Sequence, residues 1–179
     1  MHAPTAIGVK IAPVPAQILP RSNVSSRFLA YLITSKFVDG LPFYRLQTVL
    51  TRHEVAMPRG TQAAVTINAH APVVPLLNLM DEQMRASGYI RIDETPVQGL
   101  KSDANGTQQW MWVRVAGPPG QRLILFEHDP SRSAQVAARL LEGACGYVQS
   151  DGYAAYDAFA ASSQLTHVGC FAHARRRFF

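Results

Sequence analysis

The chain has 179 residues and a formal net charge of +5; 47% of its residues are hydrophobic and 16% are charged. This composition is typical of one or two globular domains and excludes wholesale disorder. The two cysteines, Cys145 and Cys170, are too few for a disulfide scaffold, and the apolar stretches are too short for a membrane span. We therefore expect a cytoplasmic protein with no membrane partner.

The charge is distributed unevenly along the chain. Residues 1–90 hold eight Lys or Arg and four Asp or Glu, whereas residues 91–174 hold six and eight. Three further arginines stand at 175–177. This asymmetry is expected if the basic first part of the chain contacts phosphates and the acidic second part binds a cation.

The first half of the chain predicts an extended arm followed by helices. Residues 1–24 contain four prolines and little periodicity, which indicates an extended arm. Residues 25–87 show helical spacing of apolar residues. Helices are expected over residues 25–40 and 42–53, and from about residue 60, with a break near Pro72–Pro75 and a resumption over 76–85.

Two short helices, a turn and a further helix resemble a helix-turn-helix. Arg52, Arg59 and Gln62 lie where such a motif contacts DNA phosphates or bases. The alternative is a small helical bundle with a solvated basic face. Residues 25–87 are therefore a candidate DNA-binding region.

Residues 88–179 predict an α/β domain. Strands are expected over residues 88–95, 109–116, 121–127, 146–150 and 165–170, and helices over 130–142 and 152–161 and from 172. Three strands followed by alternating helices and strands are the order of an RNase H-like (retroviral integrase-like) fold. In that fold the first strand is central and the fourth lies parallel beside it.

Two aspartates occupy special positions in this order. Asp93 is expected at the end of the first strand, and Asp151 directly follows the fourth. Their carboxylates would then meet at one edge of the sheet, where they repel unless a cation lies between them. Mg²⁺ suits such oxygen ligands. The alternative is that Asp93 is a turn residue and Asp151 caps the following helix.

Five short motifs follow one another in the second half of the chain. They are Asp93-Glu94-Thr95-Pro96, Trp110-Met111-Trp112, Asp129-Pro130-Ser131-Arg132, Asp151-Gly152-Tyr153 and Gly169-Cys170-Phe171-Ala172-His173-Ala174-Arg175-Arg176. With the helical segment before them, they resemble the insertion sequence 66 family of bacterial transposases, and the resemblance covers nearly the whole chain.

The resemblance implies a DNA transposase that uses an Asp-Asp-Glu triad and two divalent metal ions, Mg²⁺ or Mn²⁺, to cut DNA ends and join them to a target. Asp93 would be the first catalytic and metal ligand and Asp151 the second, whereas Glu94 should point to the opposite face. Arg175 and Arg176 are expected on the exposed face of the last helix, where, near the active edge, they are candidates to hold a DNA phosphate. The implied partners are element ends and target DNA, other element-encoded proteins and further copies of the chain, in the bacterial cytoplasm.

Cys170 and His173 match a Cys-x-x-His motif seen in several related transposases. Two such ligands do not make a structural zinc site, which takes four. We expect a structural or DNA-positioning role for this pair, with metal binding as the alternative.

Three departures from the family pattern shape the functional expectation. The family's third carboxylate lies in a segment that does not occur in these 179 residues, so the catalytic core is expected to be incomplete at its C-terminus. The usual cysteine-rich zinc-binding segment is also absent. Glu54 stands where the family tends to have glycine, and it would be strained if the backbone keeps a positive φ there.

These departures predict a partial or inactive transposase. The alternative is a non-catalytic, DNA-binding remnant of one. A third reading is an RNase H-like nuclease unrelated to transposition, which would need Asp129 or Asp157 as an additional ligand.

Overall fold

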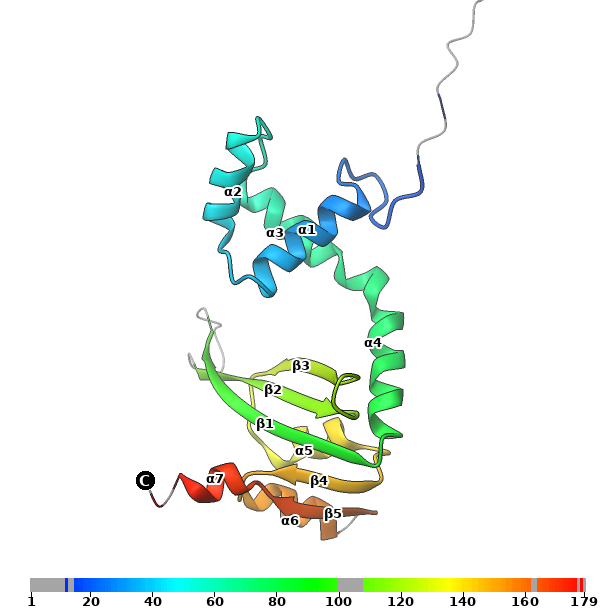
Figure 1. Ribbon diagram of the computed structural model, residues 1–179, viewed down its shortest axis with the longest axis vertical. Coiled ribbons are helices and arrows are strands. Elements are labelled where there is room, and N and C mark those ends of the chain that lie inside the picture. The colour runs from blue at the N-terminus through cyan, green and yellow to red at the C-terminus, as the bar shows by residue number, and fades with distance from the viewer. Residues whose placement is uncertain (1–11, 13–14, 100–107, 162–163, 177, 179) are drawn as a thin grey trace, which may run out of the picture. The chain divides into compact units, whose positions relative to one another are not determined.

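The computed structural model describes residues 12, 15–99, 108–161, 164–176 and 178 (Figure 1). The chain divides into two compact units, Met1–Val74 and Pro75–Phe179. The arm predicted for residues 1–24 lies largely outside the described residues.

Three helices lie wholly within the first unit. They are α1 (Ser26–Phe37), α2 (Phe43–Arg52) and α3 (Arg59–Asn68), which confirms the three helices predicted there. The side chain of Ser25 caps α1, since its Oγ accepts a hydrogen bond from the backbone N–H of Phe28 at 3.2 Å. One apolar cluster joins the helices through Leu32, Leu46, Leu50 and Met57.

The fourth helix, α4 (His70–Arg85), corrects one prediction. The break expected near Pro72–Pro75 is wrong, because the helix passes through Pro75 and the interruption falls at Ala69. Pro72 is tolerated because it lies in the first turn, where the backbone N–H groups have no intrahelical partner. Within the described residues, no single helix is long and apolar enough to cross a membrane; α3 and α4 pass that test only as a bent pair, by length and composition.

Glu54, directly after α2, has φ of 59°. The sequence predicted strain at this residue if the backbone kept a positive φ, and this condition is met. A side chain with a Cβ adopts this region at a cost that glycine does not have.

A five-stranded sheet forms the centre of the second unit. Its strands are β1 (Tyr89–Gln98), β2 (Gln108–Ala116), β3 (Leu123–Asp129), β4 (Gly146–Ser150) and β5 (Leu165–Gly169), in the spatial order β3-β2-β1-β4-β5. β1 is central, antiparallel to β2 and parallel to β4. The predicted strand order and the central first strand are therefore confirmed.

Three helices complete the second unit: α5 (Ala134–Leu141), α6 (Ala154–Ala161) and α7 (Phe171–Arg175). α5 begins later than predicted, because the Asp129 carboxylate accepts a hydrogen bond from the Ser131 backbone N–H at 2.8 Å and holds a turn there. The N-cap of α5 is Ser133. The helix predicted from residue 172 is the short α7.

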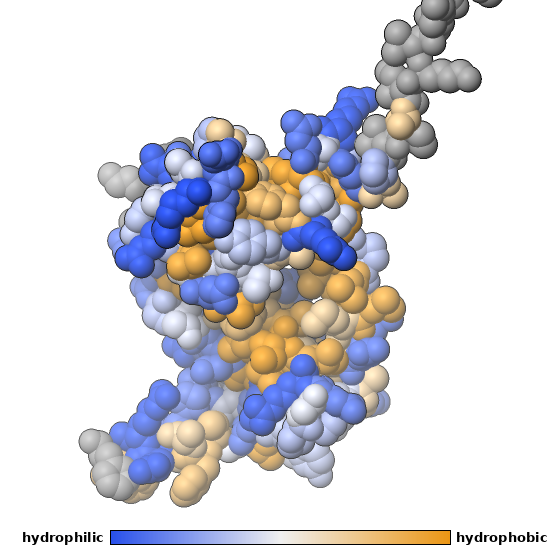
Figure 2. Space-filling view, turned by 45° about the horizontal axis from the view of Figure 1, so that its top comes forward, coloured by the Kyte–Doolittle hydropathy of each residue, from blue (hydrophilic) through white to orange (hydrophobic). Residues whose placement is uncertain are grey.

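One face of the sheet is covered and the other is more open. α5 and α6 lie on the same side of the sheet (Figure 1), and their side chains pack with Ile90, Ile92 and Trp112 in one core. On β3, the open face carries Ile124 and Phe126, whose exposed fractions are 46% and 70%. On the face drawn in Figure 2, hydrophobic residues, in orange, are exposed among hydrophilic ones, in blue.

Candidate functional site

Asp93 and Asp151 come from the two central parallel strands. The last residue pair between β1 and β4 is Arg91 with Gln149, so each aspartate lies two residues beyond it. One detail differs from the prediction: β1 does not end near Asp93 but continues to Gln98, paired with β2. Asp93 therefore lies just beyond the part of β1 that pairs with β4, near the level at which β4 ends.

The carboxylate of Asp151 is held at both oxygens. Its Oδ1 accepts a hydrogen bond from the Tyr153 backbone N–H at 3.0 Å, and its Oδ2 lies 3.6 Å from Nη2 of Arg132. The side chain is 27% exposed. Asp151 thus has a fixed orientation and still reaches solvent.

Asp93 is less constrained. Its side chain is 47% exposed, and its Oδ2 lies 3.9 Å from Nε2 of His173. Nδ1 of His173 is buried and has no hydrogen-bond partner among the described residues. Asp93 and His173 line a cavity of 170 Å³ with Arg91, Ser150 and Cys170.

Glu94 lies on the covered face of β1, as strand alternation predicts. Its side chain is 1% exposed. Oε1 accepts hydrogen bonds from Nε of Arg132 at 2.7 Å, with Nη2 at 2.6 Å, and Oε2 accepts one from the Tyr156 hydroxyl at 2.6 Å. Burial, and then this bond to Glu94, raise the pKa of Tyr156 far above its ordinary value, so the phenol stays a donor.

Arg132 connects Glu94 to Asp151. Its guanidinium lies 4.5 Å from the centre of the Tyr153 ring and 5.1 Å from that of Trp110, and its backbone carbonyl accepts a hydrogen bond from the Tyr153 hydroxyl at 3.0 Å. Burial alone would lower the pKa of Arg132, but the hydrogen bond and charge of Glu94, together with the smaller effects of Asp151 and Tyr153, outweigh it and the pKa is raised. We call Asp93, Glu94, Arg132, Asp151 and Tyr156 the site-side group.

Sequence reasoning missed Arg132 and Tyr156 as members of the site. In the sequence, Arg132 stands out only as the last residue of the Asp-Pro-Ser-Arg motif. Its place in a motif directly after β3 was the one sequence feature that pointed to a role for Arg132. The contact with Glu94 could not be predicted from local pattern, because it joins residues 38 apart in the chain.

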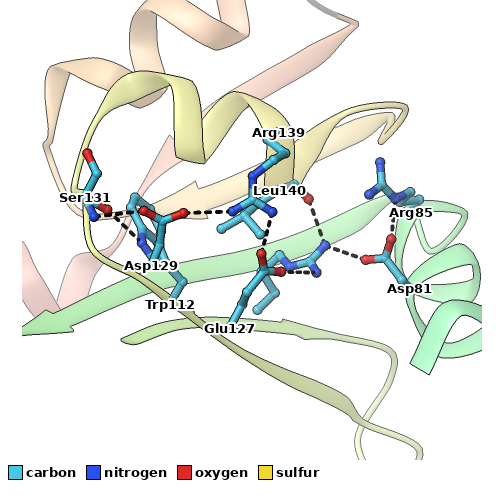
Figure 3. A network of polar contacts seen from close by, with 9 residues as sticks. Asp81, Arg85, Trp112, Glu127, Asp129, Ser131, Arg139 and Leu140 are labelled. Carbon is cyan, nitrogen blue, oxygen red and sulfur yellow. Dashed lines mark hydrogen bonds and ion pairs between the residues drawn. The ribbon is translucent and has the colours of Figure 1, made fainter. Parts of the chain in front are cut away.

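A second set of charged residues lies elsewhere in the second unit (Figure 3). Arg114 donates to Asp81 at 2.5 Å and to the Leu140 carbonyl at 2.8 Å, and Asp81 also accepts from Arg85 at 2.8 Å. We call this set the α4-side group; its members are Asp81, Arg85, Arg114, Glu127, Asp129 and Arg139.

The spare acidic candidates do not join Asp93 and Asp151. Asp129 pairs with Arg139 at 3.1 Å in the α4-side group. Asp157 pairs with His167 at 2.5 Å and is 68% exposed. The structure thus gives no support to the reading in which either residue is an additional metal ligand.

Cys170 and His173 lie at the start of α7, beside the candidate site. The Cys170 backbone N–H donates to the Ser150 carbonyl at 2.8 Å, which ties α7 to the end of β4. No group of three His, Cys, Asp or Glu side chains that could hold a metal occurs in the described part of the chain. The contact with Ser150 is made by the backbone, and the role of the Cys170 and His173 side chains stays a prediction.

The residues predicted to bind DNA differ in exposure. Arg52 and Arg59, at the end of α2 and the start of α3, are exposed, as are Arg175 and Arg176. Gln62 is a correction: its side chain is fully buried, and its amide donates to the Met57 carbonyl at 2.9 Å. In this position Gln62 packs inside the first unit and does not face a ligand.

The donor set fits a hard divalent cation. Asp93 and Asp151 each offer a carboxylate two residues beyond the last β1–β4 pair, and both reach solvent. Mg²⁺ is commonly held by one or two carboxylates, with water and substrate phosphate oxygens completing its ligands. Two aspartates therefore suffice for a site that is completed by a phosphate substrate.

Comparison with known proteins gives one consistent result. Residues 21–179 match the profile of a family described as "Transposase IS66 family". Two relatives from Sinorhizobium fredii (strain NBRC 101917 / NGR234), the uncharacterized proteins y4qI and y4jD, are 29% and 30% identical to the chain over 96% of its length. The alignments cover 34% and 36% of those proteins, so the chain spans about a third of their length.

Proposed function

This chain belongs to the transposase IS66 family, and from that premise we propose that it carries the first two carboxylates of an RNase H-like DNA transposase. The observation that carries the proposal is the placement of Asp93 and Asp151 at the level where the parallel strands β1 and β4 separate. These residues would hold a divalent metal ion, Mg²⁺ or Mn²⁺. What such an ion supplies when bound is activation of the attacking oxygen and stabilisation of the leaving oxygen at phosphorus.

The chain's own residues prepare the site for a phosphate substrate. Asp151 is held in one orientation, whereas Asp93 is free to adjust when a ligand arrives. The third carboxylate of the family's triad would come from elsewhere in the assembled transposase, together with the remaining element-encoded partners. Exposed Arg52 and Arg59 in the first unit would bind DNA phosphates through a helix-turn-helix-like region.

The experiment is a plasmid-nicking assay with the purified chain and Mg²⁺ or Mn²⁺. Asp93→Asn and Asp151→Asn should each abolish nicking, since each keeps the size of the side chain and removes a charged ligand. Asp157→Asn is the matched control, because Asp157 is an exposed aspartate that pairs with His167 away from the site. Nicking that survives both site variants would contradict the proposal.

A second candidate function, a non-catalytic DNA-binding remnant, is favoured by the lack of a third acidic ligand among the described residues. Both candidates predict DNA binding that weakens as salt increases. Arg52→Ala and Arg59→Ala should each lower the slope of log affinity against log salt by about 1. A native chain that binds DNA in this way and does not nick it would establish the second candidate.

A further inference from the structure

Arg132 contacts two carboxylates, those of Glu94 and Asp151. We propose that Arg132, anchored on buried Glu94, is a positioning residue that fixes the orientation of the Asp151 carboxylate for metal binding. The inference rests on the proposed function, in which Asp151 is a metal ligand. It adds a role for a charged pair that neither the sequence nor the comparisons assign.

The anchor is the Glu94 carboxylate. Its side chain is 1% exposed, and its oxygens accept from Arg132 and from the Tyr156 hydroxyl. A buried carboxylate with these donors has little freedom to move. Glu94 therefore fixes the guanidinium from the covered side of the sheet.

Aromatic and backbone contacts hold Arg132 from its other sides. The guanidinium contacts two aromatic rings, at 5.1 Å from the centre of the Trp110 ring and 4.5 Å from that of Tyr153. The Tyr153 hydroxyl donates to the Arg132 carbonyl at 3.0 Å. Both the side chain and the backbone of Arg132 are thus held in place.

The guanidinium of Arg132 also approaches Asp151. Nη2 lies 3.6 Å from Oδ2 of Asp151, while the Tyr153 N–H binds Oδ1. These two contacts approach opposite oxygens of one carboxylate and so limit its rotation. Residues that orient metal ligands in this way commonly change metal affinity by 10- to 100-fold when they are removed.

The test uses the full chain labelled with ¹⁵N and a double variant, Glu94→Gln with Arg132→Gln. This variant removes both charges of the buried pair together, so neither is left unpaired. The matched control is Glu127→Gln with Arg139→Gln, which removes a Glu–Arg pair that contacts neither Glu94 nor Asp151. Arg132→Lys is the second variant, because it keeps the charge but lacks the fork that reaches two carboxylates.

The first readout needs no metal. Hydrogen exchange of the Tyr153 amide reports its bond to Asp151, and it should quicken by at least about fivefold in the double variant relative to the Val148 amide. In Arg132→Lys it should quicken in the same direction, and in the control it should not change. An unchanged Tyr153 amide in both Arg132 variants overturns the proposal, whatever metal binding shows.

The second readout is paramagnetic broadening of the Gly152 and Tyr153 amide signals by Mn²⁺. The double variant should need about tenfold more Mn²⁺ for half-broadening than the native chain or the control. An equal or lower requirement overturns the proposal, since Arg132 would then not assist metal binding. If Tyr153 responds as expected but Mn²⁺ broadens no signal near Asp93 or Asp151 in the native chain, the hold on Asp151 is supported and the proposed function fails.

Discussion

The two charged groups of the second unit differ in how their charges balance. In the α4-side group, three arginines meet three carboxylates. In the site-side group, which has three carboxylates and one arginine, Arg132 contacts Glu94 and Asp151, and Asp93 lies 3.9 Å from His173. Excess negative charge at a solvent-accessible edge of a sheet favours binding of a cation, whereas a balanced network needs no ligand to explain it.

The groups also differ in how burial is used. Glu94, almost completely buried, is the anchor of the site-side group, whereas the most buried member of the α4-side group is a cation, Arg114, with 6% exposure. Buried Glu94 binds Arg132, and Arg132 in turn holds the partly exposed Asp151 in place. We infer that the α4-side group stabilises the packing of α4 and α5 on the sheet, and that the site-side group holds a carboxylate ready for a ligand.

The largest expected effect follows from removing the buried anchor. Glu94→Ala should lower the free energy of unfolding by about 3 kcal/mol, because Arg132 loses its charge partner and the Tyr156 hydroxyl loses its acceptor. Urea unfolding of the variant and the native chain measures the loss. Glu127→Ala, at a carboxylate that is 36% exposed, should cost about 1 kcal/mol or less. Equal losses would remove the distinction between the two groups.

The next effect tests the α4-side group at its most buried member. Arg114→Met should cost about 2 kcal/mol, because the Leu140 carbonyl and one oxygen of Asp81 lose their donor. The cost stays below that of Glu94→Ala because Arg85 continues to pair with Asp81. Unfolding in urea again gives the value, and a loss above that of Glu94→Ala would show that the main anchor lies in this group.

A hydroxyl pair refines the comparison within the site-side group. Tyr156→Phe should cost about 1.5 kcal/mol, since its hydroxyl donates to a charged, buried acceptor. Tyr153→Phe removes a bond to the neutral carbonyl of Arg132 and should cost about 1 kcal/mol or less. Thermal unfolding of the two variants measures both losses of stability. A larger loss for Tyr153→Phe than for Tyr156→Phe would mean that Glu94 is not the centre of the group.

Much of the fold could be predicted from the sequence, because it depends on local patterns. The alternation of apolar residues gave the strands, and the order of elements placed the first strand at the centre with the fourth parallel beside it. Asp93 and Asp151 were found because each stands next to a strand whose neighbours could be inferred. The strain at Glu54 followed from one expected backbone conformation.

The remaining features depend on contacts between distant residues. The pairing of Glu94 with Arg132 requires the turn after β3 to lie against the covered face of β1, and no local pattern encodes that distance. The amide side chain of Gln62 is of a type that commonly contacts DNA, but here it fills a buried position beside Met57. Pro75 indicates a helix break, yet α4 continues through it because packing on the sheet core outweighs one lost hydrogen bond.

The smallest expected effect is the loss of folding stability at low pH that is due to Asp81. Burial tends to raise the pKa of Asp81, but the hydrogen bonds and positive charges of Arg85 and Arg114 together outweigh it and hold the pKa below the ordinary value of 3.8. The unfolded chain therefore binds more protons than the folded chain between these two pKa values, so stability rises with pH in that range. The contribution of Asp81 is complete above pH 3.8 and is lost as the pH falls through the folded-state pKa.

Asp81→Asn removes this dependence and so isolates the α4-side group. Urea unfolding at about pH 5 and about pH 3 should show a smaller loss of stability on acidification for the variant than for the native chain. Asp157→Asn is the control, since Asp157 belongs to neither group. If Asp81→Asn and the native chain lose stability equally, the arginines do not favour the charged form of Asp81, and the α4-side group owes its stability to packing instead of to charge balance.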